Sequence, residues 1–195
     1  KQNTMDLKLL STLGFSDKDV AAVAEAQGVR QVYGGKYVDC LTICHDNFLT
    51  RVLSLPADAD SETAMNRLRL LEGRLPQAED ECVIDQNIQD KFGFSVGQPL
   101  SLTAADPQDD LLNDLNRIEY TIVGVVNSPL YIDMTRRGST TVGDGSLDAF
   151  IYLPESNFTA EYYTELYVVG EDTASLNCYT EEYDEAIRAL KAALE

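Results

Sequence analysis

Residues 69–85 of the chain read RLLEGRLPQAEDECVID, and residues 120–133 read YTIVGVVNSPLYID. In the first stretch, two short apolar runs lie on either side of Gly73, Arg74, Pro76 and a group of acidic residues. Glycine and proline mark turns, whereas short runs of apolar and β-branched residues are typical of strands. Both stretches therefore predict strands, and the first also predicts a turn at Gly73 and Arg74.

Length and charge limit the class of protein. The chain has 195 residues, and 44% of them are hydrophobic, as in a folded globular protein. The 15 Lys and Arg residues against 33 Asp and Glu residues give a net charge of -18 at pH 7. Such a charge repels nucleic-acid phosphates and anionic lipid head groups. We therefore expect no nucleic-acid partner.

No window of the sequence approaches the roughly 20 consecutive apolar residues that cross a bilayer, so we expect the chain itself to be soluble. It opens with KQNTM, which has none of the features of a secretory signal. It closes within a helical pattern, ALKAALE. We expect from these ends that the chain is a piece of a larger protein.

The first third predicts a helix and then a hairpin. The run SDKDV, which starts at the capping residue Ser16, predicts a helix that ends before Gly28. Apolar and β-branched residues at 29–33 and 36–44 predict two strands. The two glycines between these strands predict the turn of the hairpin.

The middle of the chain predicts mostly strands. Its single predicted helix, residues 86–92, has Asp85 as its N-cap and Gly93 at its end. Farther along, residues 163–172 predict a strand, and the helical spacing of Tyr183, Ile187 and Leu190 predicts a last helix over 181–194. The predicted strands of the middle are 48–55, 68–71, 81–86, 94–104, 118–129 and 148–154.

This order of elements predicts an α+β fold with two lobes. Helices and strands at both ends of the chain, residues 1–60 plus 160–195, predict one α/β lobe. Residues 61–159 predict a second, β-rich lobe that is inserted into the first.

The four cysteines are Cys40, Cys44, Cys82 and Cys178, which are too few for a disulfide scaffold. His45 is the single histidine, and most zinc sites need more histidine ligands than one. The alternation in KYVDCLTIC favours small buried residues on one strand face, and the alternative is a disulfide to Cys82 or Cys178. We predict no bond between Cys40 and Cys44. In one strand their Cα atoms would lie ~13 Å apart, beyond the ~7 Å limit.

Two other motifs superficially suggest ligands. Asp58 and Asp60 have oxygen ligands for calcium, but the glycine and distal glutamate of an EF-hand loop are missing, so we interpret them as a solvated loop. The run GSTTVGDGS at 138–146 lacks the Gly-Lys-Ser/Thr ending of a phosphate-binding loop, so we interpret it as a connection between strands. We predict no metal-binding, cofactor-binding or catalytic residues.

The residues and their order resemble a known family. The helix at SDKDV, the strand GVRQV, the turn LLEGRLP, and the stretches ECVIDQNIQDKFGFSVGQPLSL, YTIVGVVNSP and DAFIYLP precede a closing amphipathic helix. Over residues 16–195 this order is similar to the extracytoplasmic domain of MacB/FtsX-like permeases of ABC transporters. Three motifs carry the resemblance, namely the Gly-Arg-x-Pro turn, the strand entered through Val-Gly, and the Val-Gly-Val-Val strand.

The resemblance implies a non-enzymatic domain outside the cell membrane, in a permease whose transmembrane helices lie outside this sequence. It implies motion driven by ATP hydrolysis in a cytoplasmic ATP-binding subunit, and a second permease copy or an extracytoplasmic protein as further partners. The lobe of 1–60 and 160–195 would be membrane-proximal and porter-like, and the lobe of 61–159 would be sabre-like. The segments 103–117 and 135–147 look like additions to the family pattern.

In such domains the glycine motifs would be structural. Gly73 would permit a backbone angle closed to other residues, and Gly124 would allow close packing within a strand. Two alternative functions are a free-standing secreted binding or sensory protein and a hydrolase that uses two carboxylates. The hydrolase has little support, because 33 acidic residues produce many pairs by chance and no G-x-S-x-G motif occurs.

Overall fold

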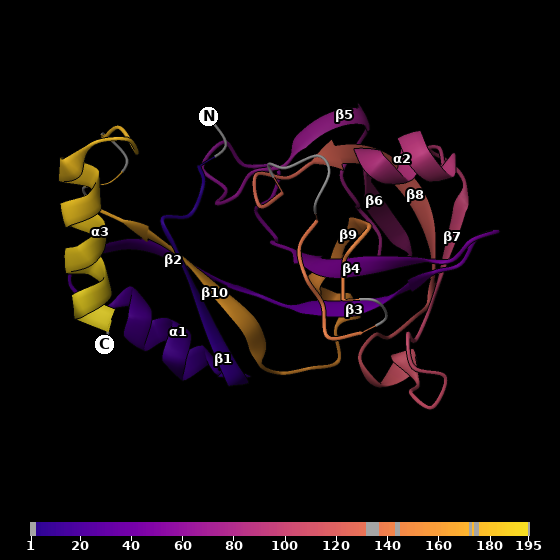
Figure 1. Cartoon of the computed structure of the whole chain (residues 1–195), viewed down its shortest axis with the longest axis horizontal. Helices are drawn as coiled ribbons and strands as arrows, with labels where there is room; N and C mark the ends of the chain where they lie inside the picture. The colour runs from indigo at the N-terminus through magenta and orange to yellow at the C-terminus, as the bar shows by residue number, and fades with distance from the viewer. Residues whose placement is uncertain (1–2, 132–136, 143–144, 172, 174–175, 195) are drawn as a thin grey trace. The chain divides into compact units, whose positions relative to one another are not determined.

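The computed structural model of the chain describes residues 3–131, 137–142, 145–171, 173 and 176–194. The chain forms two compact units, shown with their helices and strands in Figure 1. Unit 1 consists of Lys1–Asn3 and Tyr37–Ala160, and unit 2 consists of Thr4–Lys36 and Glu161–Glu195. Unit 1 thus interrupts unit 2 in the sequence, and the chain has the expected two-lobed α+β organisation. No helix in the described part of the chain combines the length and apolar character needed to span a membrane.

Unit 2 is a three-stranded antiparallel sheet with two helices. Its strands lie in the order β1-β10-β2, so β10 pairs with both of the others. One core cluster joins the sheet to the helices through Leu7, Val29, Val168 and Leu190, and Ile187 packs against it. The elements are β1 (Leu7–Phe15), α1 (Asp17–Ala24), β2 (Val29–Gly35), β10 (Tyr163–Gly170) and α3 (Glu181–Leu194).

The structure differs from the sequence prediction at two places in this unit. Strand β1 precedes the helix and was not predicted, whereas α1 ends at Ala24, before Gly28 as expected. The predicted hairpin is wrong, because Gly34 and Gly35 lie inside β2 and pair with β10. They are needed there because a Cβ atom on Gly34 would lie 2.5 Å from the ring of Tyr163. Ser16 caps α1 as predicted.

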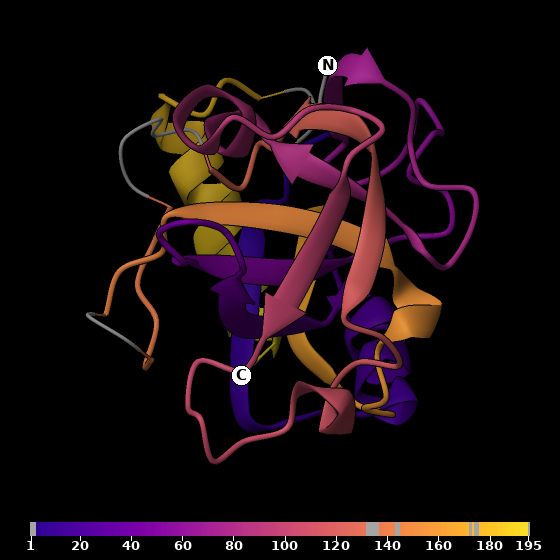
Figure 2. The same ribbon diagram turned by 90° about the vertical axis from the view of Figure 1, so that its right-hand side faces the viewer.

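Unit 1 is built around a ring of strands. Its sheet has the order β5-β8-β6-β9-β4-β3-β7, and an additional pairing of β7 with β8 closes six of the strands into a ring with β5 outside it. Figure 2 shows these strands from a second direction. The strands are β3 (Tyr37–Thr42), β4 (Phe48–Leu55), β5 (Arg69–Gly73), β6 (Glu81–Asp85), β7 (Pro99–Thr103), β8 (Glu119–Asn127) and β9 (Ala149–Pro154).

The ring strands bury side chains on both faces. In β6, Ile84 belongs to one core cluster and its neighbour Val83 belongs to a second. The same division occurs in β8, where Ile122 and Val123 lie in different clusters. The first cluster includes Cys40, Val52, Cys82, Ile84, Leu100, Leu102, Ile122 and Ile151, and the second includes Leu53, Leu55, Ala59, Val83, Val123, Val126, Phe150 and Tyr152.

The short helices of unit 1 include the predicted one. Helix α2 (Gln86–Phe92) is capped by the side chain of Asp85 and ends at Gly93 with a left-handed φ of 76°. The segment 103–117 contains the 3-10 helix η1 (Leu111–Asn113), and η2 (Glu155–Asn157) follows β9.

The boundary between the units falls at 36/37, whereas the sequence placed it after residue 60. The reason is strand pairing, because β3 and β4 pair with each other and with β7 and β9 of unit 1. The second boundary falls at 160/161, one residue after the expected position.

Candidate functional site

The candidate ligand residues His45, Asp58 and Asp60 lie in two different connections between strands of unit 1. Among the described residues, no group of three or more His, Cys, Asp and Glu side chains could hold a metal ion. Asp58 and Asp60 lie in a turn after β4, and His45 is exposed beyond the end of β3. Within the run 138–146, residues 143 and 144 lie outside the described residues, and the others lead into β9 and not into a helix.

The cysteines are free thiols. Cys40 and Cys82 are buried in the ring, Cys44 is partly buried against the same cluster, and Cys178 is exposed. Burial raises the pKa of both buried thiols far above its ordinary value. A buried thiol with a raised pKa is a poor nucleophile, so the packing interpretation fits these two residues.

The Gly73-Arg74 turn lies where β8 changes partners. The first part of β8, up to Thr121, pairs with β7, and the part from Gly124 onward pairs with β5. At the crossing, the backbone N–H of Arg74 donates to the carbonyl of Val123 over 2.9 Å. Three backbone segments therefore meet at this point.

Both glycines at the crossing have the predicted roles. Gly73 has a φ of +72°, in the left-handed region, and a Cβ atom there would lie 2.1 Å from the carbonyl oxygen of Val123. A Cβ atom on Gly124 would lie 2.4 Å from the carbonyl oxygen of Arg74. Real Cβ atoms do not approach backbone atoms so closely, and only glycine fits at either position.

The side chain of Arg74 closes the turn that follows. Its guanidinium forms two hydrogen bonds to the carboxylate of Glu81, over 2.7 and 2.5 Å. Glu81 also accepts the backbone N–H of Gln77 over 2.8 Å. The Arg74 hydrogen bond is the main reason that the pKa of Glu81 falls to about 2. The ion pair holds residues 75–80 as a closed loop.

This loop forms one wall of a groove in unit 1. The groove has a volume of about 660 Å³, and its lining also includes residues of the turn after β4 and of the start of η2. Its apolar part continues the second core cluster, since Leu55 and Ala59 belong to both. The lining also includes Pro56, Asp60, Arg67, Leu68, Leu70, Arg74, Leu75, Pro76, Pro154 and Glu155.

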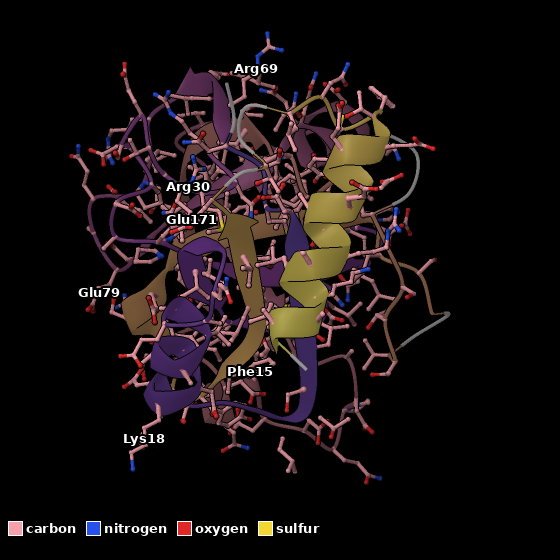
Figure 3. All side chains as sticks on the ribbon, turned by 90° about the vertical axis from the view of Figure 1, so that its left-hand side faces the viewer. Phe15, Lys18, Arg30, Arg69, Glu79 and Glu171 are labelled. Atoms are coloured by element: carbon pink, nitrogen blue, oxygen red, sulfur yellow. The ribbon has the colours of Figure 1, made fainter. Side chains whose placement is uncertain are left out.

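Strand β5 lies beside the groove and is exposed along its whole length. It pairs only with β8, so its other edge faces no strand among the described residues. Leu70 and Leu71 are 43% and 40% exposed. Arg69 extends away from the ribbon in Figure 3. Exposed leucines on an unpaired strand edge are unusual, because such an edge can recruit another chain.

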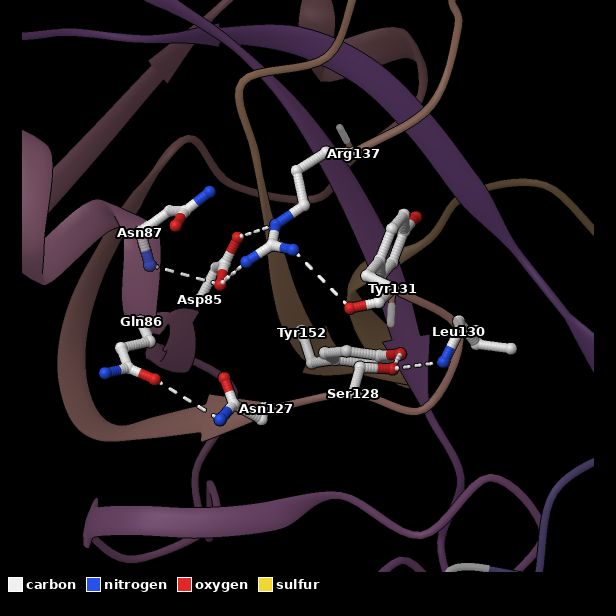
Figure 4. Close-up of polar contacts among 9 residues, drawn as sticks. All are labelled: Asp85, Gln86, Asn87, Asn127, Ser128, Leu130, Tyr131, Arg137 and Tyr152. Atoms are coloured by element: carbon white, nitrogen blue, oxygen red, sulfur yellow. Dashed lines mark hydrogen bonds and ion pairs between the residues drawn. The ribbon is translucent and has the colours of Figure 1, made fainter. Parts of the chain in front are cut away.

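A buried polar network fixes the connection between β8 and β9 (Figure 4). Arg137 and Asp85 are almost fully buried and form two hydrogen bonds, over 2.6 and 2.8 Å. Asp85 also accepts the backbone N–H of Asn87 over 3.1 Å. Nearby, the hydroxyls of Ser128 and Tyr152 lie 2.9 Å apart in a hydrogen bond.

A second arginine, Arg51, also contacts the connection between β8 and β9. Arg51 binds Asp39 through two hydrogen bonds of 2.7 Å and donates to the carbonyl of Ser139 over 3.3 Å. Its guanidinium also lies over the ring of Tyr37, 4.1 Å from the centroid.

This polar network has a structural and not a catalytic arrangement. Burial raises the pKa of Asp85, and the adjacent Arg137 opposes that effect. Both carboxylate oxygens of Asp85 are already occupied by Arg137, and one of them also caps α2. A general base needs an oxygen that can reach a substrate, so the carboxylate of Asp85 is not available for that role.

In unit 2, the carboxylate of Asp6 joins three segments. It accepts the hydroxyl of Tyr183 in the first turn of α3 over 2.8 Å and the backbone N–H of Gly170 at the end of β10 over 2.9 Å. It also accepts the hydroxyl of Thr173 over 2.5 Å. The start of β1 is therefore tied to the start of α3.

Sequence reasoning did not identify the groove, the buried arginines or Asp6. The run RLRLLEGR at 67–74 contains a usable signal, because three arginines in eight residues are uncommon in a chain with a net charge of -18. The partners of Arg137 and Asp6 could not be read from the sequence, because they lie 52 and up to 177 positions away.

One comparison with known proteins identifies a family for the chain. A family model described as the MacB-like periplasmic core domain matches residues 3–186. A comparison with curated proteins found no match.

Similar solved structures include the extracellular domain of the noncanonic ABC-type transporter YknZ from Gram-positive bacteria, at 13% identity and a TM-score of 0.47, over 93% of this chain and 87% of that one. The periplasmic region of MacB from Actinobacillus actinomycetemcomitans matches at 14% identity and a TM-score of 0.45, over 95% and 76% of the two chains. A domain of a putative permease protein from Porphyromonas gingivalis matches at 18% identity and a TM-score of 0.47, over 93% and 77%.

Proposed function

We propose, since this chain belongs to the family of MacB-like periplasmic core domains of ABC transporter permeases, that it carries motion from ATP hydrolysis in the cytoplasm to a substrate or partner outside the membrane. The match of the family model over residues 3–186 is the observation that carries this proposal. In it, the chain is held at the cell membrane by transmembrane helices of the same permease, with the domain on the extracytoplasmic side.

The partners follow from the same proposal. A cytoplasmic ATP-binding subunit would act through the transmembrane helices, and a second permease copy or an extracytoplasmic protein would complete the assembly. Unit 2 would be the membrane-proximal, porter-like lobe, and unit 1 the sabre-like lobe. The domain itself would have no enzymatic activity.

Unit 2 has the internal connections that a mechanical element needs. Helix α3 packs on the sheet through Ile187, Leu190 and Leu194. Asp6 joins β1 to the first turn of α3 through the hydroxyl of Tyr183. A displacement of β1 or of α3 is therefore passed to the other element through packed side chains and a hydrogen bond, which a Gly/Ser linker would absorb.

The test measures motion in the full-length permease, reconstituted in lipid nanodiscs with its ATP-binding subunit. Spin labels are placed at the exposed Cys178 and at Glu79→Cys, with Cys44→Ser to prevent background labelling. We expect ATP with vanadate to shift the distance distribution between the labels. An unchanged distribution in a permease that hydrolyses ATP when vanadate is left out would refute the coupling.

Two variants locate the coupling in unit 2. Ala189→Pro removes a backbone donor from the interior of α3, at a cost of about 3 kcal/mol or more, and should abolish the distance shift while ATP hydrolysis continues. Ala189→Ser is the matched control and should behave like the unmodified protein. Tyr183→Phe keeps the helix and removes only the bond to Asp6, so a reduced shift in this variant excludes helix unfolding as the explanation.

A further inference from the structure

The groove and the free edge of β5 form one continuous surface. Leu70 belongs to both, because it lies in the strand and also lines the groove. Side chains of adjacent strand residues point to opposite faces, so Leu70 faces the groove and Arg69 faces the other side. We define the β5 surface as Arg67, Arg69, Leu70, Leu71 and the groove beside them.

We propose that the β5 surface binds an extended segment of a partner protein in which apolar and acidic side chains alternate. The segment would add to β5 as a further strand, with its apolar side chains in the groove and its carboxylates on the other face, beside Arg69. Strand addition of this kind uses main-chain hydrogen bonds for affinity and pockets for alternate side chains for specificity.

The charge of the β5 surface supports an acidic partner. Arg67 and Arg69 form no ion pair within 4.0 Å with any carboxylate in the described part of the chain, whereas Arg51, Arg74 and Arg137 each have one. Both arginines are therefore available to the carboxylates of a partner, in a chain with a net charge of -18. Two acidic residues, Asp60 and Glu155, also line the groove.

The apolar content of the groove supports the alternation. Its volume of about 660 Å³ lies within the ~300–1,000 Å³ range of ligand pockets. Leu68, Leu70 and Leu75 supply apolar lining on the β5 side. A strand with an apolar residue at every second position can place those side chains in the groove, and its intervening side chains then lie on the face of Arg69.

The crossing of β5 and β8 makes the surface rigid before binding. Gly73 and Gly124 hold the end of β5 against β8, and the Arg74–Glu81 pair holds the adjacent groove wall. Preorganisation of this kind lowers the entropic cost of binding an extended peptide.

The experiment uses the 195-residue chain and a fluorescein-labelled peptide with the sequence EVDVEVD. Fluorescence anisotropy should show saturable binding that weakens as salt is added, because the ion pairs are exposed. Two peptides serve as controls. KVKVKVK has the same apolar pattern with the opposite charge, and EVDPEVD has a proline that removes a main-chain donor. Equal binding of all three peptides, or no binding of EVDVEVD, would overturn the proposal.

Variants locate the binding surface. Arg69→Glu should lower the affinity for EVDVEVD at least tenfold. Arg30→Glu makes the same change of charge at an exposed position in unit 2 and should change the affinity less than twofold. If both variants have equal effects, binding is a general response to net charge and the assignment fails.

Hydrogen exchange and sedimentation complete the test. Bound peptide should slow amide exchange in β5, and unchanged exchange there would contradict strand addition. Concentration-dependent self-association that Arg69→Glu abolishes would identify a second copy of the chain as the occupant and overturn the assignment to a partner protein. No step uses nucleotide, so this inference and the coupling proposal can fail separately.

Discussion

Alanine at Gly73 or Gly124 should separate β5 from β8 without disturbing the ring. The structural reason is the short distance between the added methyl group and a backbone oxygen on the other segment. That distance is 2.1 Å from position 73 to Val123 and 2.4 Å from position 124 to Arg74. Because backbone atoms cannot turn aside as a flexible side chain can, one of the two segments must move.

The expected loss of stability can be divided into two parts. A non-glycine residue at the left-handed φ of Gly73 costs about 1–2 kcal/mol. The collision adds about 1–3 kcal/mol, so Gly73→Ala should cost about 2–5 kcal/mol in all. Gly124→Ala carries only the collision and should cost about 1–3 kcal/mol. The double variant should cost less than the sum, because β5 moves only once.

Gly97→Ala is the matched control. Gly97 also has a left-handed φ, of +89°, but a Cβ atom there would have no neighbour within 4 Å. Its alanine variant should therefore show the conformational cost alone, about 1–2 kcal/mol. Urea unfolding measures each free energy, and hydrogen exchange shows whether the amides of β5 open before those of β6. If Gly73→Ala and Gly97→Ala differ by less than about 0.5 kcal/mol, or if the double variant is additive, the reasoning is wrong.

Three further predictions concern single side chains. The pKa of Glu81 is about 2 in the folded chain and 4.5 without its partners, so the stability due to its pair with Arg74 should be complete above pH 4.5 and lost as the pH falls towards 2. In Glu81→Gln, the free energy of unfolding, measured with urea at each pH, should change less over that range. An unchanged dependence on pH would contradict the assignment. Arg137→Met leaves the carboxylate of Asp85 buried without its ion pair and should cost about 3–5 kcal/mol, with partial recovery in the double variant Arg137→Met, Asp85→Asn; a loss below about 1 kcal/mol would show that the pair is not needed. In the folded chain, a thiol reagent should modify the exposed Cys178 quickly and the two buried ring thiols only after unfolding; rapid reaction of all four thiols would exclude the buried assignment.

Local signals in the sequence predicted local structure well. Asp85 and Gly93 define both ends of α2, because an N-cap and a left-handed C-terminal glycine act within one turn of the helix. The special roles of Gly73 and Gly124 followed from the family resemblance, and the structure confirms them through a left-handed φ and two short Cβ distances. These two glycines were thus visible before the fold.

Signals that depend on distant partners were not visible. The sequence of β1, LKLLSTLGF, does not alternate regularly between apolar and polar residues, so its pattern does not predict a strand. In the structure, Leu10 and Leu13 are 69% and 90% exposed. Position 34 of strand β2 must be glycine, because the ring of Tyr163 occupies the space that a side chain would need. No residue near Gly34 in the sequence indicates this. The closing of the ring and the β5 surface likewise depend on strand register between segments far apart in the sequence.

The position of β10 in the three-stranded sheet has a consequence for biosynthesis. Strands β1 and β2 are made first, but they pair with β10 and not with each other. The sheet of unit 2 therefore cannot form until residues 163–170 have left the ribosome, by which time the contiguous stretch of unit 1 is already complete. Until then β1 has no hydrogen-bonded neighbour, and Leu7, which is buried in the folded unit, lacks its packing partners. A nascent chain therefore carries β1 unpaired for longer than it carries any strand of unit 1, and transiently unpaired strands are prone to aggregation.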